Sequence, residues 1–271
     1  MNKLLSVQDV QDRFVERYRH VESDLVRDIE RCVCGCDYGA SSWTTVDEIQ
    51  LIIALLGLNE DKYMLELGAG TGWPGLKLAE QTACQALLTD LPLDGLEIAH
   101  RRAATDGLDE KVAVASASGS LLPFPTASFD AVFHSDVLCC LPEKKEVLEE
   151  CRRCVAPGGC MVFPVIFPTT NLSAEDQQLV LDGGPPFGEI EQSYPDMLAQ
   201  TGWEMTKQID LTDQFTQSMA LMDKKLTQYS GELDNLKGQE IAAEERCRRA
   251  NAVRATVRGI LRRELYRAIP A

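Results

Sequence analysis

The sequence is poor in histidine, in aromatic residues and in positive charge. It contains 3 His, 6% aromatic residues, and 27 Lys and Arg against 42 Asp and Glu, which gives a net charge of −15 at pH 7. A general nucleic-acid-binding protein needs a basic surface, so this balance argues against nucleic acid as a partner. An acidic body is compatible with a cationic substrate, although a high net charge more often serves solubility.

Long apolar runs are also missing. No apolar stretch approaches the roughly 18 residues of a membrane-spanning helix, and the N-terminal residues include acids and form no cleavable apolar segment. We therefore expect a cytoplasmic protein without a membrane partner. The apolar content of 45% is sufficient for a full core, and the length predicts one large domain, or one domain with a cap.

The 10 cysteines lack the paired spacing of a structural zinc site. Cys32, Cys34 and Cys36 alternate, and Cys151 and Cys154 form a CxxC, but neither group has a second CxxC or an HxxxH partner. Without an export signal the thiols are expected to be reduced, and no metal site is predicted. Thiol chemistry or soft-metal binding by the alternating group is the less favoured alternative to a structural role.

The most informative segment spans residues 64–90 and reads MLELGAGTGWPGLKLAEQTACQALLTD. An apolar strand ends in Gly68, Gly70 and Gly72, a helix follows, and a second apolar run ends in Asp90. Glycine lets a ligand approach the backbone closely, because no Cβ stands in the way. A strand, a glycine turn, a helix and a strand that ends in an acid can seat a nucleoside, with the acid on the ribose hydroxyls.

The spacing GAGTG, with an acid two residues before it, differs from the dinucleotide fingerprint GxGxxG. It resembles the first motif of the class I S-adenosylmethionine-dependent methyltransferases, which is an acid, any residue and then GxGxG. The resemblance implies S-adenosyl-L-methionine as cofactor, with its methionine part held by Glu66, Gly68, Ala69 and Gly70, and its ribose held by Asp90. An ordinary strand–helix turn with packing glycines is the alternative.

Two later segments carry the same resemblance. Residues 121–131 read LLPFPTASFDA, and residues 155–159 read VAPGG. Both resemble UbiE-like and glycine/sarcosine-type small-molecule methyltransferases, and the resemblance is strongest over residues 64–165. Relatives commonly place an acid against the adenine amino group where this chain has Ser118, and Leu91 is expected to line the adenine.

The expected fold class is α/β: a Rossmann-like class I methyltransferase sheet with helices on both faces, an N-terminal helical lid and a C-terminal helical cap insertion. We divide the chain into N-terminal helices and lid (1–60), an S-adenosylmethionine-binding core (61–210), a helical substrate cap (211–258) and a final segment (259–271). Apolar spacing would make the final segment a helix, whereas the resemblance favours a closing strand. Two arginines and a glutamate in its middle argue against deep burial.

Three local expectations concern the remaining segments. Apolar residues at intervals of three and four predict one amphipathic helix over Val7–Arg31. Thr45 followed by Glu48 predicts a capping box that opens a helix over Val46–Leu56. The Gly/Pro-containing stretch Phe167–Gly188 is expected to be a mobile loop.

Residues 36–48 hold two aromatic side chains, Tyr38 and Trp43, in a loop rich in small residues. The segment resembles the lid that lies over the active site of small-molecule methyltransferases, which would place both aromatics at the cofactor or the reacting groups. A pair of aromatics that simply packs in a loop is the alternative of equal weight.

The fourth expected strand ends at His134, Ser135 and Asp136. Groups at the carboxyl ends of parallel strands face the ligand crevice, so His134 and Asp136 are predicted to lie near the transferred methyl. A His can serve as a base near neutral pH, or His134 can be a hydrogen-bonded core residue. Relatives often have a His where this chain has Cys140, and its absence puts a base for carbon methylation in doubt.

These residues predict methyl transfer from S-adenosyl-L-methionine to a small metabolite, with an amine nitrogen as the first choice of acceptor. Such an in-line displacement is promoted by holding the two reactants together and excluding water. The alternatives are a cofactor-binding regulatory module without turnover, an arsenite, thiol or carbon methyltransferase, and methylation of a macromolecule. The core has no basic patch, which disfavours the last. The oligomeric state stays open.

Overall fold

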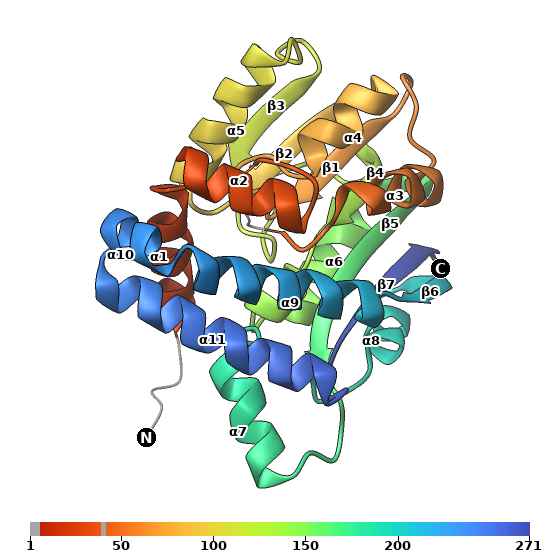
Figure 1. The fold of residues 1–271 in the computed structure, drawn as a ribbon. Helices are drawn as coiled ribbons and strands as arrows, with labels where there is room; N and C mark the ends of the chain where they lie inside the picture. The colour runs from red at the N-terminus through yellow and green to blue at the C-terminus, as the bar shows by residue number, and fades with distance from the viewer. Residues whose placement is uncertain (1–5, 39–41) are drawn as a thin grey trace.

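A seven-stranded sheet forms the centre of the structure, a computed structural model that describes residues 6–38 and 42–271 (Figure 1). The strands lie in the order β3-β2-β1-β4-β5-β7-β6; β7 is antiparallel to β5 and β6, and the other pairs are parallel. The predicted Rossmann-like class is thereby confirmed. The strands are Tyr63–Leu67 (β1), Gln85–Asp90 (β2), Val112–Ser116 (β3), Phe129–His134 (β4), Val155–Pro168 (β5), Trp203–Asp210 (β6) and Leu261–Pro270 (β7).

Helices cover both faces of this sheet. Along β1, Met64 belongs to one buried apolar cluster and Leu65 to the other, because successive side chains of a strand point to opposite faces. The helices are Val7–Tyr18 (α1), Asp24–Val33 (α2), Ile49–Leu56 (α3), Gly75–Thr82 (α4), Leu93–Thr105 (α5), Lys144–Cys154 (α6), Ala174–Gly183 (α7), Tyr194–Gln200 (α8), Thr212–Gln228 (α9), Ser230–Lys237 (α10) and Gln239–Val257 (α11). Short 3₁₀ turns are formed by Val46–Glu48 (η1) and Leu138–Cys140 (η2).

The single N-terminal helix predicted over residues 7–31 is wrong, because the chain forms α1 and α2 with a turn between them. Within that turn Val21 is fully buried, in a small apolar cluster with Tyr18 and Ile98 of α5. The Ser23 side chain then accepts a hydrogen bond from the backbone N–H of Val26 and caps α2. Burial of the turn against α5 therefore overrides the continuous helical periodicity.

The predicted capping box at Thr45 is also wrong. The Thr45 side chain makes no capping hydrogen bond, and η1 rather than an α-helix follows it. Both carboxylate oxygens of Glu48 accept hydrogen bonds from Nη1 of Arg263, at 2.9 and 3.0 Å. The Glu48 carboxylate is thus held in a buried ion pair, and the half of the capping box that is missing is the one from the Thr45 side chain.

The stretch 167–188 is not a loop throughout, since it contains α7. Ser173 caps this helix by accepting a hydrogen bond from the backbone N–H of Asp176. At the other end of α7, a Cβ on Gly183 would lie 2.4 Å from the backbone nitrogen of Ala252, so α7 packs directly on α11. The expectation of a mobile loop missed both the cap and this contact.

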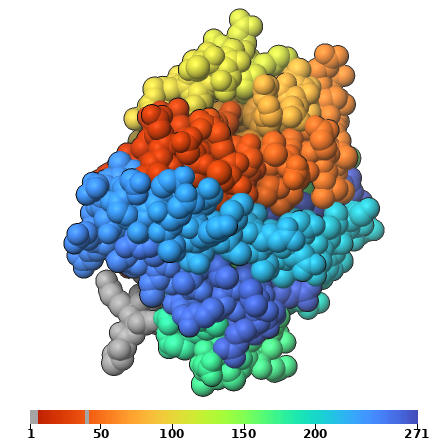
Figure 2. Space-filling view, in the orientation of Figure 1, coloured from red at the N-terminus to blue at the C-terminus, as the bar shows by residue number. Residues whose placement is uncertain are grey.

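The helices α9, α10 and α11 lie between β6 and β7 in the chain, where a helical insertion was expected. In Figure 1, α9 and α11 run alongside each other across the front of the sheet. Figure 2 shows this blue cap directly against the red N-terminal helices, in agreement with the contact between α2 and α9. Within the described residues, no helix combines the length and the apolar character needed to cross a membrane.

The final segment is the strand β7, as the resemblance favoured, but the expectation against deep burial is wrong. Arg263 is fully buried in β7, and its guanidinium donates hydrogen bonds to Asp136 at 3.0 Å, to Glu48 at 2.9 Å and to Thr44 Oγ1 at 3.2 Å. Ionic partners from two other parts of the chain make burial of this charge possible. The described residues thereby link β7 to the end of β4 and to the N-terminal part of the chain.

We expect Arg263→Ala to lower the free energy of unfolding by about 3–5 kcal/mol, because it leaves two buried carboxylates without their cation. Arg101→Ala is the matched control: Arg101 is more than half exposed and pairs with the exposed Glu22 at 2.8 Å, so it should change stability by at most about 1 kcal/mol. Urea unfolding followed by circular dichroism measures both. Equal effects of the two substitutions would contradict the importance of the buried network.

Candidate active site

The glycine turn after β1 is tied to the acid at the end of β2. The backbone N–H of Gly70 donates to Asp90 Oδ2 at 2.8 Å, and the backbone N–H of Leu91 donates to Asp90 Oδ1 at 2.7 Å. Gly68 has a left-handed φ of 65°, and a Cβ there would lie 2.4 Å from Val137 Cγ2. Glycine is therefore required at this position both by its backbone conformation and by the close approach of the loop after β4.

Burial raises the pKa of Asp90 to about 6, and the two backbone hydrogen bonds oppose this rise. The carboxylate faces a cavity and also holds the turn in place. At neutral pH the group is mostly ionised, so it can accept hydrogen bonds from two neighbouring hydroxyls. That is the chemistry expected of an acid that binds a ribose.

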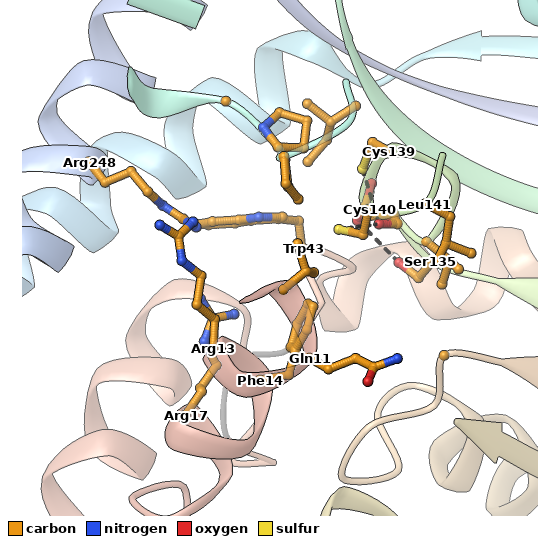
Figure 3. Close-up of a pocket in the computed structure, with 18 of the residues that line it drawn as sticks. Gln11, Arg13, Phe14, Arg17, Trp43, Ser135, Cys139, Cys140, Leu141 and Arg248 are labelled. Carbon is orange, nitrogen blue, oxygen red and sulfur yellow. Dashed lines mark hydrogen bonds between the residues drawn. The ribbon is translucent and has the colours of Figure 1, made fainter. Parts of the chain in front are cut away.

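A cavity of about 180 Å³ opens from this turn toward the helices of the cap (Figure 3). This is more than ten times the roughly 10–15 Å³ needed for one water, so the cavity can hold an organic molecule. Three kinds of residue line the cavity. A glycine and acidic residues lie at the carboxyl ends of the strands, apolar side chains come next, and arginines of α1 and α11 lie beyond them. The lining includes Gly68, Asp90, Leu91, Asp136, Val137, Cys139, Cys140, Val10, Phe14, Trp43, Phe215, Met219, Arg13, Arg17, Arg248 and Arg249.

Five of the residues predicted from the sequence line this cavity. Gly68, Asp90 and Leu91 lie at its cofactor-like end, and Asp136 and Trp43 lie beside them and further in. The structure thus brings together the glycine turn, the acid after β2, the acid after β4 and one aromatic of the expected lid, although they are far apart in the sequence.

Glu66, near the end of β1, and Ala69 and Gly70, within the turn, do not line the cavity. Glu66 is 1% exposed, and its Oε2 would lie 1.8 Å from a Cβ on Gly75, so its carboxyl group faces the start of α4. Burial raises the pKa of Glu66 well above its usual value. The carboxyl group of Glu66 therefore lies against the backbone of Gly75, outside the cavity lining.

His134 is not placed to act as a base. It is fully buried, its ring stacks on Phe163 with centroids 4.7 Å apart, and it does not line the cavity. Burial lowers its pKa to about 3, so the ring is neutral at physiological pH. Among the described residues neither ring nitrogen has a hydrogen-bond partner, so His134 is a core residue but not the hydrogen-bonded one of the alternative interpretation.

Tyr38 also lies outside the cavity. Its hydroxyl donates to Asp106 Oδ2 at 3.2 Å, and its ring packs against Trp73, with centroids 5.5 Å apart, and against the guanidinium of Arg102. The hydroxyl is used in this contact, so the structure does not support a catalytic role for Tyr38. Residues 39–41 of the expected lid lie outside the described part of the chain.

Ser118 does not reach the cavity, and its hydroxyl lies 3.0 Å from that of Ser120. Trp43, by contrast, does cover the cavity. Its ring meets Phe215 of α9 edge-on at 5.5 Å, and the guanidinium carbon of Arg249 lies 4.4 Å from its centre. Of the two aromatics of the expected lid, Trp43 thus lines the cavity and Tyr38 does not.

Asp136 carries its charge in a buried ion pair. The residue has a left-handed φ of 56°, and Arg263 Nε lies 3.0 Å from Oδ1 and 3.3 Å from Oδ2. The Ser135 hydroxyl donates to Oδ2 at 3.2 Å. With both carboxylate oxygens held by Arg263 and one also by Ser135, Asp136 can orient a polar group but is a poor candidate for a base.

Two groups of residues that line the cavity were not predicted from the sequence as site residues. Cys139 and Cys140 follow β4, and the Cys139 thiol donates to the carbonyl oxygen of Asp136 at 3.1 Å. The arginines on α1 and α11 form the second group, and an excess of basic residues after Lys237 was the sequence signal that pointed toward it. In the described residues no group of three or more His, Cys, Asp and Glu could hold a metal ion.

Comparison with known proteins agrees with this site. A family model described as a methyltransferase domain matches residues 65–163, which span β1 to β5. The chain is 28% identical over 194 residues to (+)-O-methylkolavelool synthase of Herpetosiphon aurantiacus, a match that covers 68% of this chain and 65% of that protein. It is 26% identical over 205 residues to sarcosine/dimethylglycine N-methyltransferase of Halorhodospira halochloris, covering 71% and 69%.

The fold extends beyond the matched domain. The crystal structure of the [4+2]-cyclase SpnF superposes with a TM-score of 0.79 at 18% identity, and covers 97% of this chain and 95% of that one. The sequence match, however, reaches just under two thirds of the length of the O-methylkolavelool synthase. The methyltransferase domain matched over residues 65–163 supports a class I S-adenosylmethionine-dependent methyltransferase, and the glycine turn, the acid after β2 and the strand order with an antiparallel β7 agree with it.

Proposed function

We propose that this protein transfers a methyl group from S-adenosyl-L-methionine to a small metabolite, with an amine nitrogen as the acceptor. The observation that carries the proposal is the single cavity that runs from the Gly68 turn and Asp90 to the helices of the cap. A cofactor at the turn and an acceptor under the cap would lie in one enclosed space, as an in-line displacement requires.

The residues at the turn fit the cofactor. Asp90 offers an ionised carboxylate to the ribose hydroxyls, Gly68 leaves room for the methionine part, and Leu91 offers an apolar surface to the adenine. When bound, S-adenosyl-L-methionine supplies a methyl group on a sulfonium. The protein's part is to hold both reactants and to exclude water with Trp43 and Phe215.

An amine acceptor fits the groups available in the cavity. His134 lies outside it and Asp136 is paired with Arg263, so neither of the two groups expected near the transferred methyl offers the strong base that a carbon acid needs. A neutral amine attacks with its own lone pair. The sarcosine/dimethylglycine relative points to the same acceptor class.

Arsenite methylation is the second candidate, because two adjacent thiols line the cavity. Cys32, one of the three alternating cysteines considered for soft-metal binding, is exposed on α2 and lies outside the cavity lining. Cys139 and Cys140 would have to take its place as soft ligands. Arsenite-dependent turnover that Cys140→Ser leaves unchanged would exclude this candidate.

The proposal is tested first by transfer of a labelled methyl from S-adenosyl-L-methionine into a cell extract separated by size. We expect label in the small-molecule fraction with wild-type protein and much less with Asp90→Ala when the cofactor is below saturation. Label in macromolecules would overturn the small-metabolite proposal. Absence of label, with S-adenosylhomocysteine still bound, would favour a regulatory module, and the likeness to a protein named as a cyclase makes that control necessary.

Asp90→Ala should weaken binding of S-adenosylhomocysteine by about tenfold to a hundredfold. The reason is the loss of charge-assisted hydrogen bonds to the ribose, each worth about 1.5–3 kcal/mol. Asp109→Ala, at an exposed position after α5, is the control and should bind as the wild type does. Isothermal titration calorimetry measures both, and equal affinities of the two variants would show that Asp90 does not hold the ribose.

The pH dependence of binding should follow Asp90, whose pKa in the folded protein is about 6. Affinity for S-adenosylhomocysteine should fall as the pH is lowered through about 6, because a protonated carboxyl accepts hydrogen bonds more weakly.

The stability of the folded protein should depend on the same group. The pKa of Asp90 in the folded protein lies above its ordinary value, so the ionised carboxylate lowers the free energy of unfolding at neutral pH. Protonation removes this destabilisation as the pH falls from about 6 to about 4. Asp90→Asn should therefore raise the melting temperature more at pH 7.5 than at pH 4.5; an equal change at both values would contradict the shift.

A further inference from the structure

The end of the cavity farthest from the glycine turn is formed by four arginines. Arg13 and Arg17 come from α1, and Arg248 and Arg249 from α11. In Figure 3, Arg13, Arg17 and Arg248 lie on one side of the cavity, and Cys139, Cys140 and Ser135 lie on the opposite side. Such a concentration of positive charge is unexpected in a chain with a net charge of −15, and we refer to these four residues as the arginine cluster.

Arg249 is the most deeply buried member of the cluster, with 8% of its surface exposed. Its Nη1 lies 2.9 Å from Met219 Sδ and its guanidinium covers the Trp43 ring, but its Nε has no hydrogen-bond partner among the described residues. Burial first, and then the neighbouring Arg248 and Arg17, lower its pKa to about 9. A buried guanidinium without a carboxylate is costly unless a ligand supplies the missing anion.

Arg248 also has hydrogen-bond donors that no other side chain of the described residues uses. Its pKa is lowered to about 10 by burial and by the positive charges of Arg17 and Arg13. Within the described part of the chain it forms no hydrogen bond or ion pair. Two adjacent arginines therefore face the cavity with hydrogen-bonding capacity that the protein itself does not use.

Of the described glutamates near the cluster, only Glu244 comes within ion-pair distance of one of its arginines, the exposed Arg13. Glu245 pairs with Lys237 at 2.7 Å, Glu16 pairs with Arg19 and His20, and Glu244 lies 3.5 Å from Arg13 with both side chains largely exposed. These three glutamates border a groove on the outer side of the cluster and do not line the cavity. The acids that do line it, Asp90 and Asp136, lie at the strand ends, and Asp136 is already neutralised by Arg263.

We propose that the arginine cluster binds an oxyanion group, a carboxylate or a phosphate, at the end of the acceptor that lies away from the transferred methyl. Guanidinium groups match carboxylate and phosphate oxygens with paired hydrogen bonds. Phe14, Trp43, Phe215 and Met219 line the cavity between the cluster and the strand ends, so the acceptor has an apolar body. This inference rests on the proposed function, because it places the acceptor in the same cavity as the reacting centre.

The test measures binding of octyl phosphate, octanoate and octanol by isothermal titration calorimetry, with and without saturating S-adenosylhomocysteine. These probes share one apolar chain and differ only in the head group. We expect at least one of the two anions to bind at least about tenfold more tightly than the alcohol, and the stronger of them identifies the preferred oxyanion. Added salt should weaken the anion but not the alcohol.

Arg248→Gln should reduce the affinity of the preferred anion about tenfold or more and leave octanol binding unchanged, whereas Arg248→Lys should retain part of it. Arg258→Gln is the matched control, because Arg258 follows the same helix and pairs with Glu175 outside the cavity. Melting temperatures within the range of the control exclude unfolding of the variants.

Two results would overturn the inference: octanol binding as tightly as both anions, or no measurable binding of either anion. An Arg248→Gln effect of equal size on anion and alcohol would overturn it as well. Failure of the proposed function looks different, since it would appear as loss of S-adenosylhomocysteine binding or of methyl transfer while the preference of the cofactor-free protein for the anion is retained.

Discussion

The buried guanidinium of Arg263 is the interaction on which the arrangement of the site depends. It extends from β7 to the carboxylates of Asp136 and Glu48 and to the hydroxyl of Thr44. These contacts join β7 to the end of β4 and to the segment before α3. The ion pairs lie next to the cavity, because Asp136 is part of its lining. Because a buried charge must be matched by partners with good geometry, these three parts of the chain are held in one arrangement.

The ion pairs of Arg263 also limit the reactions that side chains next to the cavity can promote. They keep Asp136 as a paired anion, and the sheet keeps His134 among apolar side chains, where burial lowers its pKa to about 3. Neither group can act as a strong base. The site is therefore suited to a reaction in which positioning and exclusion of water contribute more than proton removal.

The two ends of the cavity are built in different ways. The cofactor-like end uses backbone hydrogen bonds and a glycine at a left-handed φ, features of the sheet itself. The opposite end is built from side chains of α1 and α11, helices that flank or interrupt the sheet in the chain. A fold shared with a protein named as a cyclase shows that the sheet alone leaves the reaction open; the helices, which bring the arginine cluster, carry the information about the acceptor.

The sequence by itself determined the sheet, the glycine turn and Asp90, because these depend on local signals: apolar strands, alternating glycines and an acid at a strand end. Only the tertiary structure decided the pairing of Arg263 with Glu48, the burial of His134 and the meeting of α1 with α11 at the arginine cluster. The residues of the Arg263 pair lie 215 positions apart, and no periodicity reports a contact over such a separation. Burial and charge pairing are properties of the folded molecule, so the acceptor end of the cavity became visible only there.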